Sequence, residues 1–521
     1  MSSFPWLTTL ILLPLIGAGI VMLTPKDSPL LAKRIAIGVS VVALALTVAM
    51  ALKFDPNSTS QFQFVETHSW ISSFGISYSV GVDGIALVLI ALSAILVPLV
   101  MIAGWNDADD ATGSVKGYFA LILVLEAFMI GVFSALDVFL FYVLFEAMLI
   151  PVFFLVGRYG GPGRQYAAVK FLLYSLLGGL LMLAALIGLY VASGNQLGQG
   201  TFSFTILEQL NLDPGTQKLL FLGFFIAFAI KAPLVPFHTW LPDTAAASTP
   251  GTAVLLVGVL DKVGTFGMIR LCLPLFPDAS RYFTPVIIVL CVVGIVYGAL
   301  LAIGQTDLKR LIAYTSVSHF GFIGLGIFAM TTQGQSGSTF YMLNHGFSTG
   351  ALFLIVGFMM TRRGSRLVAD YGGVYRVAPI LAGLFLIAGL SSLSLPGMSS
   401  FISEFLVLVG TFAKYKVAAI IATTGIVLAA MYILYLYQRT MTGPVKEGCE
   451  KERFSDLRGR EVLAVAPLLV LIVALGVYPK PVLDVINPAV DRVMISVGAT
   501  DPPPTVPAAV GTGGLTEGGN R

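Results

Sequence analysis

The sequence predicts an all-α polytopic membrane protein, and three observations lead to that fold class. Hydrophobic residues make up 57% of the 521-residue chain and charged residues only 11%, whereas soluble domains are usually about one quarter charged. The mean hydropathy is +0.91. Apolar runs that approach the roughly 20 residues needed to cross a bilayer recur along most of the chain. A chain of this composition is expected to bury its apolar surface against lipid.

About fourteen of these runs are expected to form transmembrane helices. Residues 1–24 lack the basic start and the small-residue cleavage site of a signal peptide, so we expect a retained first span. The segment 379–413 is too long for one straight helix, and "SLPGMSS" (394–400) interrupts it. The predicted spans are 4–24, 31–52, 82–104, 115–134, 136–157, 165–192, 217–238, 249–275, 282–305, 309–330, 336–361, 379–413, 416–440 and 462–483.

Lysine and arginine are concentrated in the loops that follow odd-numbered spans. The positive-inside rule places those loops in the cytoplasm, and both termini with the long loops 53–81 and 193–216 on the other side. The predicted organisation is three N-terminal spans with an outer loop (1–114), a first five-helix unit (115–275), a second unit (276–440), a cytoplasmic loop with the last span (441–486) and a mobile Pro- and Gly-rich tail (487–521).

The charge balance and the cysteines argue against several classes of function. A net charge of +3, without a basic cluster interleaved with aromatic residues, gives no indication of nucleic-acid binding. Cys272, Cys291 and Cys449 lie far apart and predict no disulfide framework, zinc site or iron–sulfur site. No Gly-x-Gly-x-x-Gly run follows a strand pattern. We therefore expect neither a metal nor a redox cofactor in this chain.

Ionisable residues inside predicted spans are candidate functional residues, because a central charge costs about 2.5–3.5 kcal/mol. In "FFIAFAIKAPLVPFHTW" (224–240), Lys231 precedes two helix-breaking prolines, Pro233 and Pro236. Carbonyls freed by such a break are tolerated where they line a wet cavity or are buried in protein. Lys231 thus combines a titratable amine with a break that can admit water, which predicts a proton-carrying site in a discontinuous helix.

Glu146, in "FYVLFEAMLIPVFF" (141–154), is the carboxylate whose charge complements Lys231. Burial disfavours the charged form of each group and an opposite charge favours it, so moving the carboxylate would switch the lysine between loading and releasing a proton. The alternative is a static ion pair that ties two helices together.

Lys262 lies in "LVGVLDKVGTFG" (256–267), where Gly258, Gly264 and Gly267 allow close helix approach. Its neighbour Asp261 need not pair with it, because consecutive helical residues point about 100° apart. For Asp261, a structural role and a proton role are equally open.

Two histidines lie in adjacent predicted spans, His319 in "YTSVSHFGFIG" and His345 in "YMLNHGFSTG". An imidazole suits proton relay, since its unperturbed pKa lies near 6.5. The alternative is a hydrogen bond to a nearby hydroxyl of Ser316, Ser318 or Ser348. A metal site is not indicated, because neither histidine has a second histidine or a carboxylate at the i+4 position.

Glu404 follows Pro396 in "SLPGMSSFISEFLVL" (394–408), so a second charge lies beside a second break. The breaks fall in spans seven and twelve, which are five spans apart. Two spans separated by an odd number cross the membrane in opposite directions, so spans 4–8 and 9–13 are predicted to be inverted repeats. Glu126 and Asp137 are further candidates, although a cap at the start of the fifth span is the alternative for Asp137. Arg270, near a helix end, is expected to extend to the membrane surface.

Three motifs carry a resemblance to a known family. "KAPLVPFHTWLPD" (231–243), "QTDLKRLIAYTSVSH" (305–319) and "LPGMSSFISEFLVL" (395–408) closely resemble the antiporter-like membrane subunits of respiratory complex I, over residues 80–440 and in the same order. Within that family Glu404 resembles the chain M type, the equivalent of mitochondrial subunit 4, whereas the sister chains L and N and Mrp antiporter subunits place a lysine there. Two positions depart from the family: Ala245 stands where a histidine is usual, with His238 nearby, and Asp261 where a leucine is usual.

The resemblance implies a proton pathway, with Glu146 and Lys231 as the key pair, Lys262 and the histidines as connectors and Glu404 at the exit. It implies a complex in a bacterial plasma membrane that oxidises NADH, reduces a quinone and pumps protons. FMN, iron–sulfur clusters and the quinone would belong to the other membrane-arm and peripheral subunits. The alternatives are a subunit of an Mrp-type sodium/proton antiporter or of a membrane-bound hydrogenase, and a purely structural membrane spacer.

Overall fold

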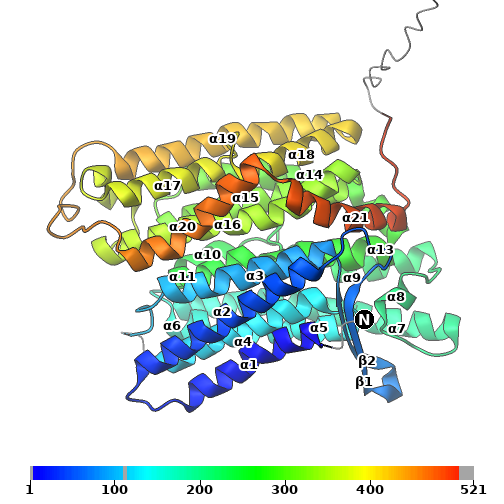
Figure 1. Ribbon diagram of the computed structural model, residues 1–521. Helices are drawn as coiled ribbons and strands as arrows, with labels where there is room; N and C mark the ends of the chain where they lie inside the picture. Colours follow the sequence, from blue (N-terminus) through cyan, green and yellow to red (C-terminus); the bar gives the residue numbers. More distant parts are fainter. Residues whose placement is uncertain (1–3, 110–113, 504–521) are drawn as a thin grey trace, which may run out of the picture.

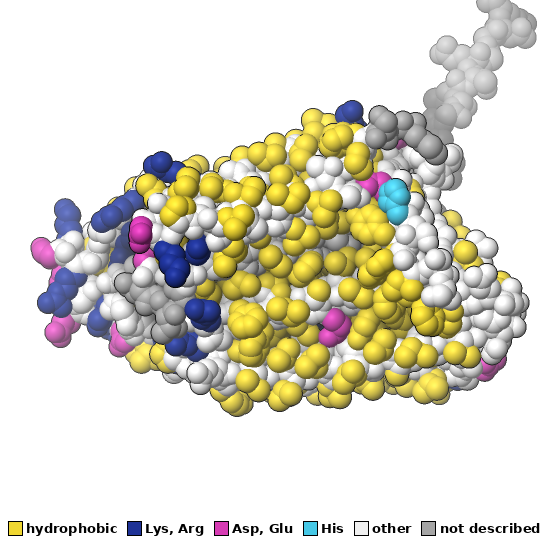
Figure 2. All heavy atoms as spheres, turned by 90° about the horizontal axis from the view of Figure 1, so that it is seen from below, with side chains coloured by type: hydrophobic (Ala, Val, Ile, Leu, Met, Phe, Trp, Pro, Cys, Tyr) yellow, Lys and Arg dark blue, Asp and Glu magenta, His cyan; other side chains and the backbone are white. Residues whose placement is uncertain are grey.

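The computed structural model describes residues 4–109 and 114–503. Among these residues, twelve helical segments are long and apolar enough to cross a membrane, and they lie side by side in one broad bundle (Figure 1). Hydrophobic side chains cover the middle of the face seen in Figure 2, whereas lysines and arginines gather at one end. The predicted polytopic helical membrane fold is therefore confirmed.

The chain begins with α1 (Trp6–Leu23) and α2 (Pro29–Lys53), which pack on each other. An antiparallel hairpin of β1 (Gln63–Ile71) and β2 (Ile76–Val82) follows, joined by a short 3-10 turn at Ser72–Phe74. This hairpin is an addition to the predicted all-α fold, within a segment expected to be a loop. Its signal was present, because residues 76–82 alternate between apolar and small polar or glycine positions, which is a strand pattern. Next comes α3 (Gly84–Ala103).

The segment predicted as the first unit contains two interrupted helices, at residues 138–159 and 214–247, and one helix with π-helical turns. Its first helices are α4 (Val115–Ser134), α5 (Val138–Ala147) with α6 (Leu149–Tyr159), α7 (Arg164–Leu197), the short α8 (Phe204–Leu207), and α9 (Pro214–Lys231) with α10 (Trp240–Ala247). The last segment runs through α11 (Pro250–Leu255), the π-helical η2 (Leu256–Leu260), α12 (Asp261–Gly267), the π-helical η3 (Met268–Cys272) and α13 (Leu273–Leu275).

The segment predicted as the second unit also contains an interrupted helix. Its elements are α14 (Pro277–Ile303), α15 (Leu308–Phe328), α16 (Thr332–Arg363), 3-10 turns at Val368–Asp370 and Val374–Arg376, α17 (Pro379–Ser392) with α18 (Ser399–Lys414), and α19 (Lys416–Met441).

Both predicted helix breaks are present. Residues 232–239 separate α9 from α10, and they contain Pro233 and Pro236; residues 393–398 separate α17 from α18, and they contain Pro396. Proline removes a backbone donor and cannot continue a helix without loss of a hydrogen bond, which accounts for both positions. The count of fourteen spans and the inverted relationship of the two units stay predictions.

The C-terminal region differs from the prediction. The last predicted span is α20 (Gly459–Val477), and a further helix, α21 (Lys480–Val497), occupies the start of the predicted mobile tail. The tail prediction is therefore wrong for residues 487–497, where an apolar stripe of α21 is buried. Its approach to α3 is so close that a Cβ on Gly84 would lie 1.8 Å from the Val485 carbonyl oxygen. Polar residues and Pro488 interrupt the sequence of α21 and hid that stripe; residues 504–521 lie outside the described part.

The two ends of the bundle differ in composition. The N-terminus, the β1–β2 hairpin and α21 lie together at one end, while the loop between α19 and α20 lies at the other (Figure 1). Figure 2, which is turned about the horizontal axis of Figure 1, shows lysines and arginines gathered at that second end.

Candidate functional site: a line of buried ionisable side chains

The first break ends α9 at Lys231, which is 1% exposed. The indole N–H of Trp240 donates to the Ile230 carbonyl over 2.9 Å, so the protein itself satisfies a carbonyl next to the break. Lys231 Nζ has no hydrogen-bond partner among the described residues. It faces the rings of Phe145 and Phe171, whose centroids lie 4.8 and 5.6 Å away. The break therefore holds a buried amine between aromatic faces, an arrangement that attracts a cation without locking its protons in hydrogen bonds.

Glu146 lies near the end of α5 and interacts electrostatically with Lys231. The two groups form no ion pair, however, because Lys231 Nζ and Glu146 Oε1 both lack a hydrogen-bond partner in the described part of the chain. The alternative of a static tie between two helices is therefore not what this structure contains.

Two consecutive glycines of α7 position Glu146. A Cβ on Gly179 would lie 1.9 Å from Glu146 Oε1, so the carboxylate occupies the space that a side chain would fill. On the neighbouring residue, a Cβ on Gly178 would lie 3.0 Å from the Cα of Ala227 in α9. This glycine pair lets α7 approach α5 and α9 at once, which keeps Glu146 close to Lys231.

Lys262 is fully buried in α12, between the two π-helical turns, and it contacts α16. Its Nζ lies 2.7 Å from Nδ1 of His345 and donates a second, short hydrogen bond to the Val257 carbonyl. The ring centroid of Phe320 lies 5.2 Å from the same Nζ. π-Helical turns are rare and occur frequently at functional sites. They could not be predicted here, since no residue pattern announces an i to i+5 hydrogen bond.

The predicted relay histidines contact each other. The rings of His319 and His345 lie edge to face with centroids 5.3 Å apart, and the Tyr432 hydroxyl lies 3.4 Å from Nε2 of His319. The alternative of a hydroxyl partner is partly right for His319, whose hydroxyl neighbour is Tyr432. It is wrong in naming serines, because their hydroxyls bond to backbone carbonyls or to other serines: Ser316, Ser318 and Ser348.

Glu404 is 4% exposed on α18, beside the second break. Two tyrosines that lie against His319 also interact electrostatically with Glu404: Tyr432, and Tyr341, whose ring centroid is 5.7 Å from that of His319. Sequence reasoning missed both tyrosines, because neither carries a charge that would mark it in an apolar span. The break itself is lined by three hydroxyls within 2.6–3.2 Å of one another, those of Ser348, Ser391 and Ser400.

The remaining sequence candidates make no hydrogen bond, in the described part of the chain, to the buried ionisable residues above: Glu146, Lys231, Lys262, His319, His345 and Glu404. Asp137 caps α5 by accepting from the amides of Phe139 and Leu140, which confirms the capping alternative. His238 lies in the first break and faces Tyr297 of α14, with ring centroids 5.4 Å apart. Glu126 is fully buried in α4, and neither of its carboxylate oxygens has a partner among the described residues.

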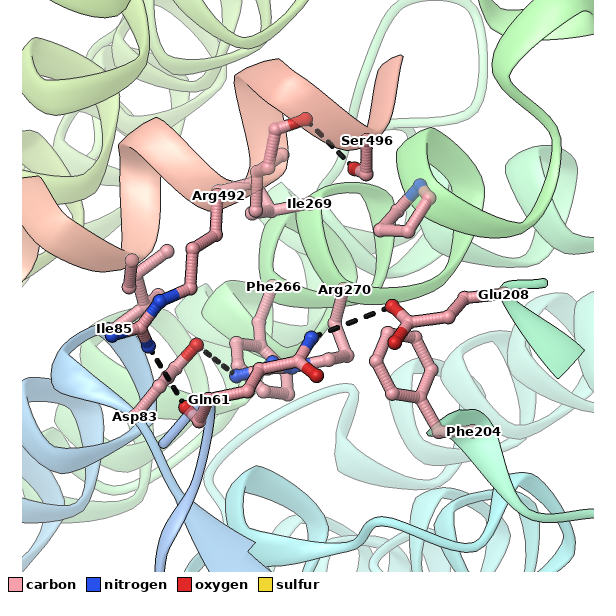
Figure 3. Close-up of a pocket in the computed structure, with 13 residues that line it drawn as sticks. Gln61, Asp83, Ile85, Phe204, Glu208, Phe266, Ile269, Arg270, Arg492 and Ser496 are labelled. Carbon is pink, nitrogen blue, oxygen red and sulfur yellow. Dashed lines mark hydrogen bonds and ion pairs between the residues drawn. The ribbon is translucent and has the colours of Figure 1, made fainter. Parts of the chain in front are cut away.

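Arg270 lies near one end of the bundle and forms a buried ion pair with Asp83. Its Nη2 lies 2.7 Å from Oδ2 of Asp83, and both side chains are more than nine-tenths buried. Figure 3 shows this pair in a small cavity below α21, where Arg492 donates to the Gln61 carbonyl and the Gln61 amide to Glu208. These contacts fasten the hairpin segment and α21 over one end of the bundle.

A second charged cluster, which the sequence analysis did not single out, lies near the start of α15. Asp243 of α10 accepts from Lys170 over 2.7 Å and from Arg310. Lys309 donates to the Ser248 carbonyl over 2.6 Å. In the turn after α3, burial raises the pKa of Asp107 to about 6, and the positive charge of Lys309 opposes that rise. Asp243 thus pairs with two cations near this end of the bundle, whereas Lys231 Nζ and Glu146 Oε1 in the interior have no hydrogen-bond partner among the described residues and Lys262 bonds to an imidazole.

Broken helices that carry lysines, histidines and carboxylates among buried apolar helices are typical of ion-translocating membrane proteins. The family is shown by two family models. Residues 135–429 match the one described as NADH:quinone oxidoreductase/Mrp antiporter, and residues 10–132 match the amino terminus of NADH-ubiquinone oxidoreductase chain 4. The chain belongs to the NADH-quinone oxidoreductase subunit M (chain 4) family.

Individual relatives agree over nearly their full length. The subunit M of Mycobacterium tuberculosis is 55% identical, over 99% of this chain and 100% of the relative. The chain 4 of Marchantia polymorpha is 39% identical, over 94% and 97%. Among solved structures, respiratory complex I from Thermus thermophilus with bound NADH contains a chain with a TM-score of 0.84 and 29% identity, over 95% of this chain and 100% of that one. A chain of an Mrp complex from Dietzia, 21% identical over 95% and 100%, shares the fold with a TM-score of 0.82.

Proposed function

We propose that this chain is a proton-translocating membrane-arm subunit of NADH:quinone oxidoreductase. The observation that carries the proposal is the contact between Lys262 and His345. An amine and an imidazole lie in hydrogen-bond contact in the interior of the bundle, where both groups can exchange a proton and where a purely structural contact needs no titratable partner.

The proposed path begins at Glu146 and Lys231, continues through Lys262, His345 and His319, and ends at Glu404. Lys231 holds a proton while Glu146 is charged and releases it when that charge is moved or neutralised. Because the two groups are not in direct contact, proton transfer between them requires an intervening water. At the other end, the serine hydroxyls at the second break offer a polar way out from Glu404.

The likeness to subunit M supports a proposal for the orientation of this chain in the membrane and for its partner subunits. The end rich in lysine and arginine faces the cytoplasm of a bacterial cell, and both termini lie on the other side of the plasma membrane. The partners are the other membrane-arm and peripheral subunits of the complex and the surrounding lipid. FMN, iron–sulfur clusters and the quinone lie in those partner subunits, whose redox chemistry drives the proton movement in this chain.

The test replaces the buried amine. Lys231→Ala is expected to lower NADH-driven proton uptake into inverted membrane vesicles at least about tenfold, the order expected for loss of a proton-transfer group, while native gels show a fully assembled complex. Lys231→Arg is expected to be similarly impaired, because an arginine does not release its proton in proteins. Lys218→Ala, near the start of the same helix, is the matched control. Wild-type pumping by an assembled Lys231→Ala complex would refute the proposal.

A further inference from the structure

Helix α12 carries two consecutive ionisable residues, Asp261 and Lys262, whose side chains face different helices. Lys262 contacts α16 through His345. Asp261 is fully buried, and neither of its carboxylate oxygens has a hydrogen-bond partner among the described residues. Native proteins rarely bury a carboxylate without partners, and inside a membrane such a group is a functional-site candidate.

The packing of α12 on α9 shows which way Asp261 faces. Gly264, one helical turn later, is pressed against the end of α9: a Cβ there would lie 2.6 Å from the Phe228 carbonyl oxygen and 2.6 Å from the Ala232 nitrogen. Residues at i and i+3 share a helix face, and side chains tilt toward the N-terminus of their helix. Asp261 therefore lies on the face that α12 turns toward α9, whose last residue is Lys231.

The electrostatic neighbourhood agrees with this orientation. Asp261 interacts with the charges of both Lys231 and Lys262, and its unbonded oxygens leave it free of an ion pair with either lysine. A carboxylate between two amines, and locked to neither, can accept a proton from one and deliver it to the other.

We propose that Asp261 is the proton carrier that connects Lys231 to Lys262. Asp261 has no hydrogen bond to either lysine, so each of its transfers passes through an intervening water. The ammonium of Lys231 gives one proton to the Asp261 carboxylate, which leaves a neutral amine and a carboxylic acid. The acid then gives that proton to the neutral amine of Lys262, whose ammonium in turn protonates His345. Each step moves one proton and conserves the total charge. This inference rests on the proposed function and adds to it the group that joins its two halves.

The experiment compares three substitutions at this position in the complete complex. Asp261→Leu removes the acid, Asp261→Asn keeps its size and polarity without titration, and Asp261→Glu keeps the acid. The Leu and Asn variants are expected to lose at least about tenfold in NADH-driven proton uptake into inverted vesicles, with native gels showing normal assembly, and the Glu variant is expected to regain most of the rate. Thr265→Val, which alters another buried polar side chain of α12, is the matched control and should pump normally.

The outcomes separate this inference from the proposed function. Normal pumping by Asp261→Asn, in an assay where Lys231→Ala abolishes pumping, would overturn the role of Asp261 alone; normal pumping by Lys231→Ala would overturn the function as well. A Glu variant no better than Asn would show that an acid is not what the position requires, and would also overturn the inference. The double variant of Lys231→Ala with Asp261→Asn should pump no worse than Lys231→Ala, because consecutive carriers on one path are not additive. If the Leu variant fails to assemble, the proton uptake of the Asn and Glu variants tests whether Asp261 is a proton carrier.

Discussion

Lys262 Nζ and His345 Nδ1 lie 2.7 Å apart, although 83 residues separate them along the chain. One comes from α12, in a helix interrupted by π-helical turns, and the other from α16, the longest helix in the second half of the chain. The ring of His345 also meets that of His319 edge to face. His345 thus stands between the lysine and the second histidine, and a proton that moves between them has to pass it.

This position makes His345→Phe the most direct test of the relay. Phenylalanine keeps a ring in the buried site but cannot accept a proton from Lys262, so proton uptake by inverted vesicles should fall at least about tenfold while assembly on native gels is retained. His68→Phe, at an exposed position of the β1–β2 hairpin, is the control and should leave proton uptake unchanged. A His345→Phe complex that pumps at the wild-type rate would place the path elsewhere.

Gly179→Ala should disturb the site without removing any ionisable group. The added methyl would overlap Glu146 Oε1, which lies 1.9 Å from that point, so the carboxylate has to move away from Lys231. We expect a loss of proton uptake that approaches that of Glu146→Gln. Gly194→Ala, on the same helix but with its nearest neighbour at 3.5 Å, should behave as wild type. Equal activities of the two alanine variants would show that the position of Glu146 is not critical.

Glu404 should respond to substitution according to titration rather than size. Glu404→Gln keeps the volume but cannot carry a proton, so pumping should fall with the complex intact. Glu404→Lys should be tolerated better than Glu404→Ala, because lysine also titrates. Wild-type rates in both the Gln and the Ala variants would remove Glu404 from the path. If the Lys variant is worse than the Ala variant, the site needs an acid in particular.

The buried pair of Arg270 and Asp83 predicts an effect on stability instead of on pumping. Arg270→Leu leaves the carboxylate of Asp83 buried without its partner, which should cost about 3–5 kcal/mol and lower the temperature at which the subunit dissociates or unfolds in detergent. Asp83 also caps α3 by accepting from the Ala86 amide. Asp83→Asn, added to Arg270→Leu, should recover part of that loss, because asparagine removes the unpaired charge and can still act as the cap. The measurement is thermal unfolding of the purified complex; a double variant less stable than Arg270→Leu would contradict this account.

Much of the fold could be predicted from the sequence because its causes are local. Hydropathy marks the spans, since each must match the thickness of a bilayer by itself. Both helix breaks follow from prolines, whose ring chemistry acts on the adjacent backbone whatever the tertiary context. The strand alternation of the hairpin was present but not used, whereas α21 has a weak local pattern and becomes stable only when its apolar stripe packs on α3 and neighbouring helices.

The sequence by itself also determined which residues could carry charge through the membrane, because Lys231, Lys262 and Glu404 are costly in apolar spans wherever they face. Only the tertiary structure decided what each of them contacts. It brought Lys262 to His345, turned Asp261 toward α9, paired Arg270 with Asp83 and left Glu146 without an ion pair. These relationships depend on the rotation and spacing of helices far apart in the chain, which are set by close contacts such as those at Gly179 and Gly264 and which no local pattern encodes.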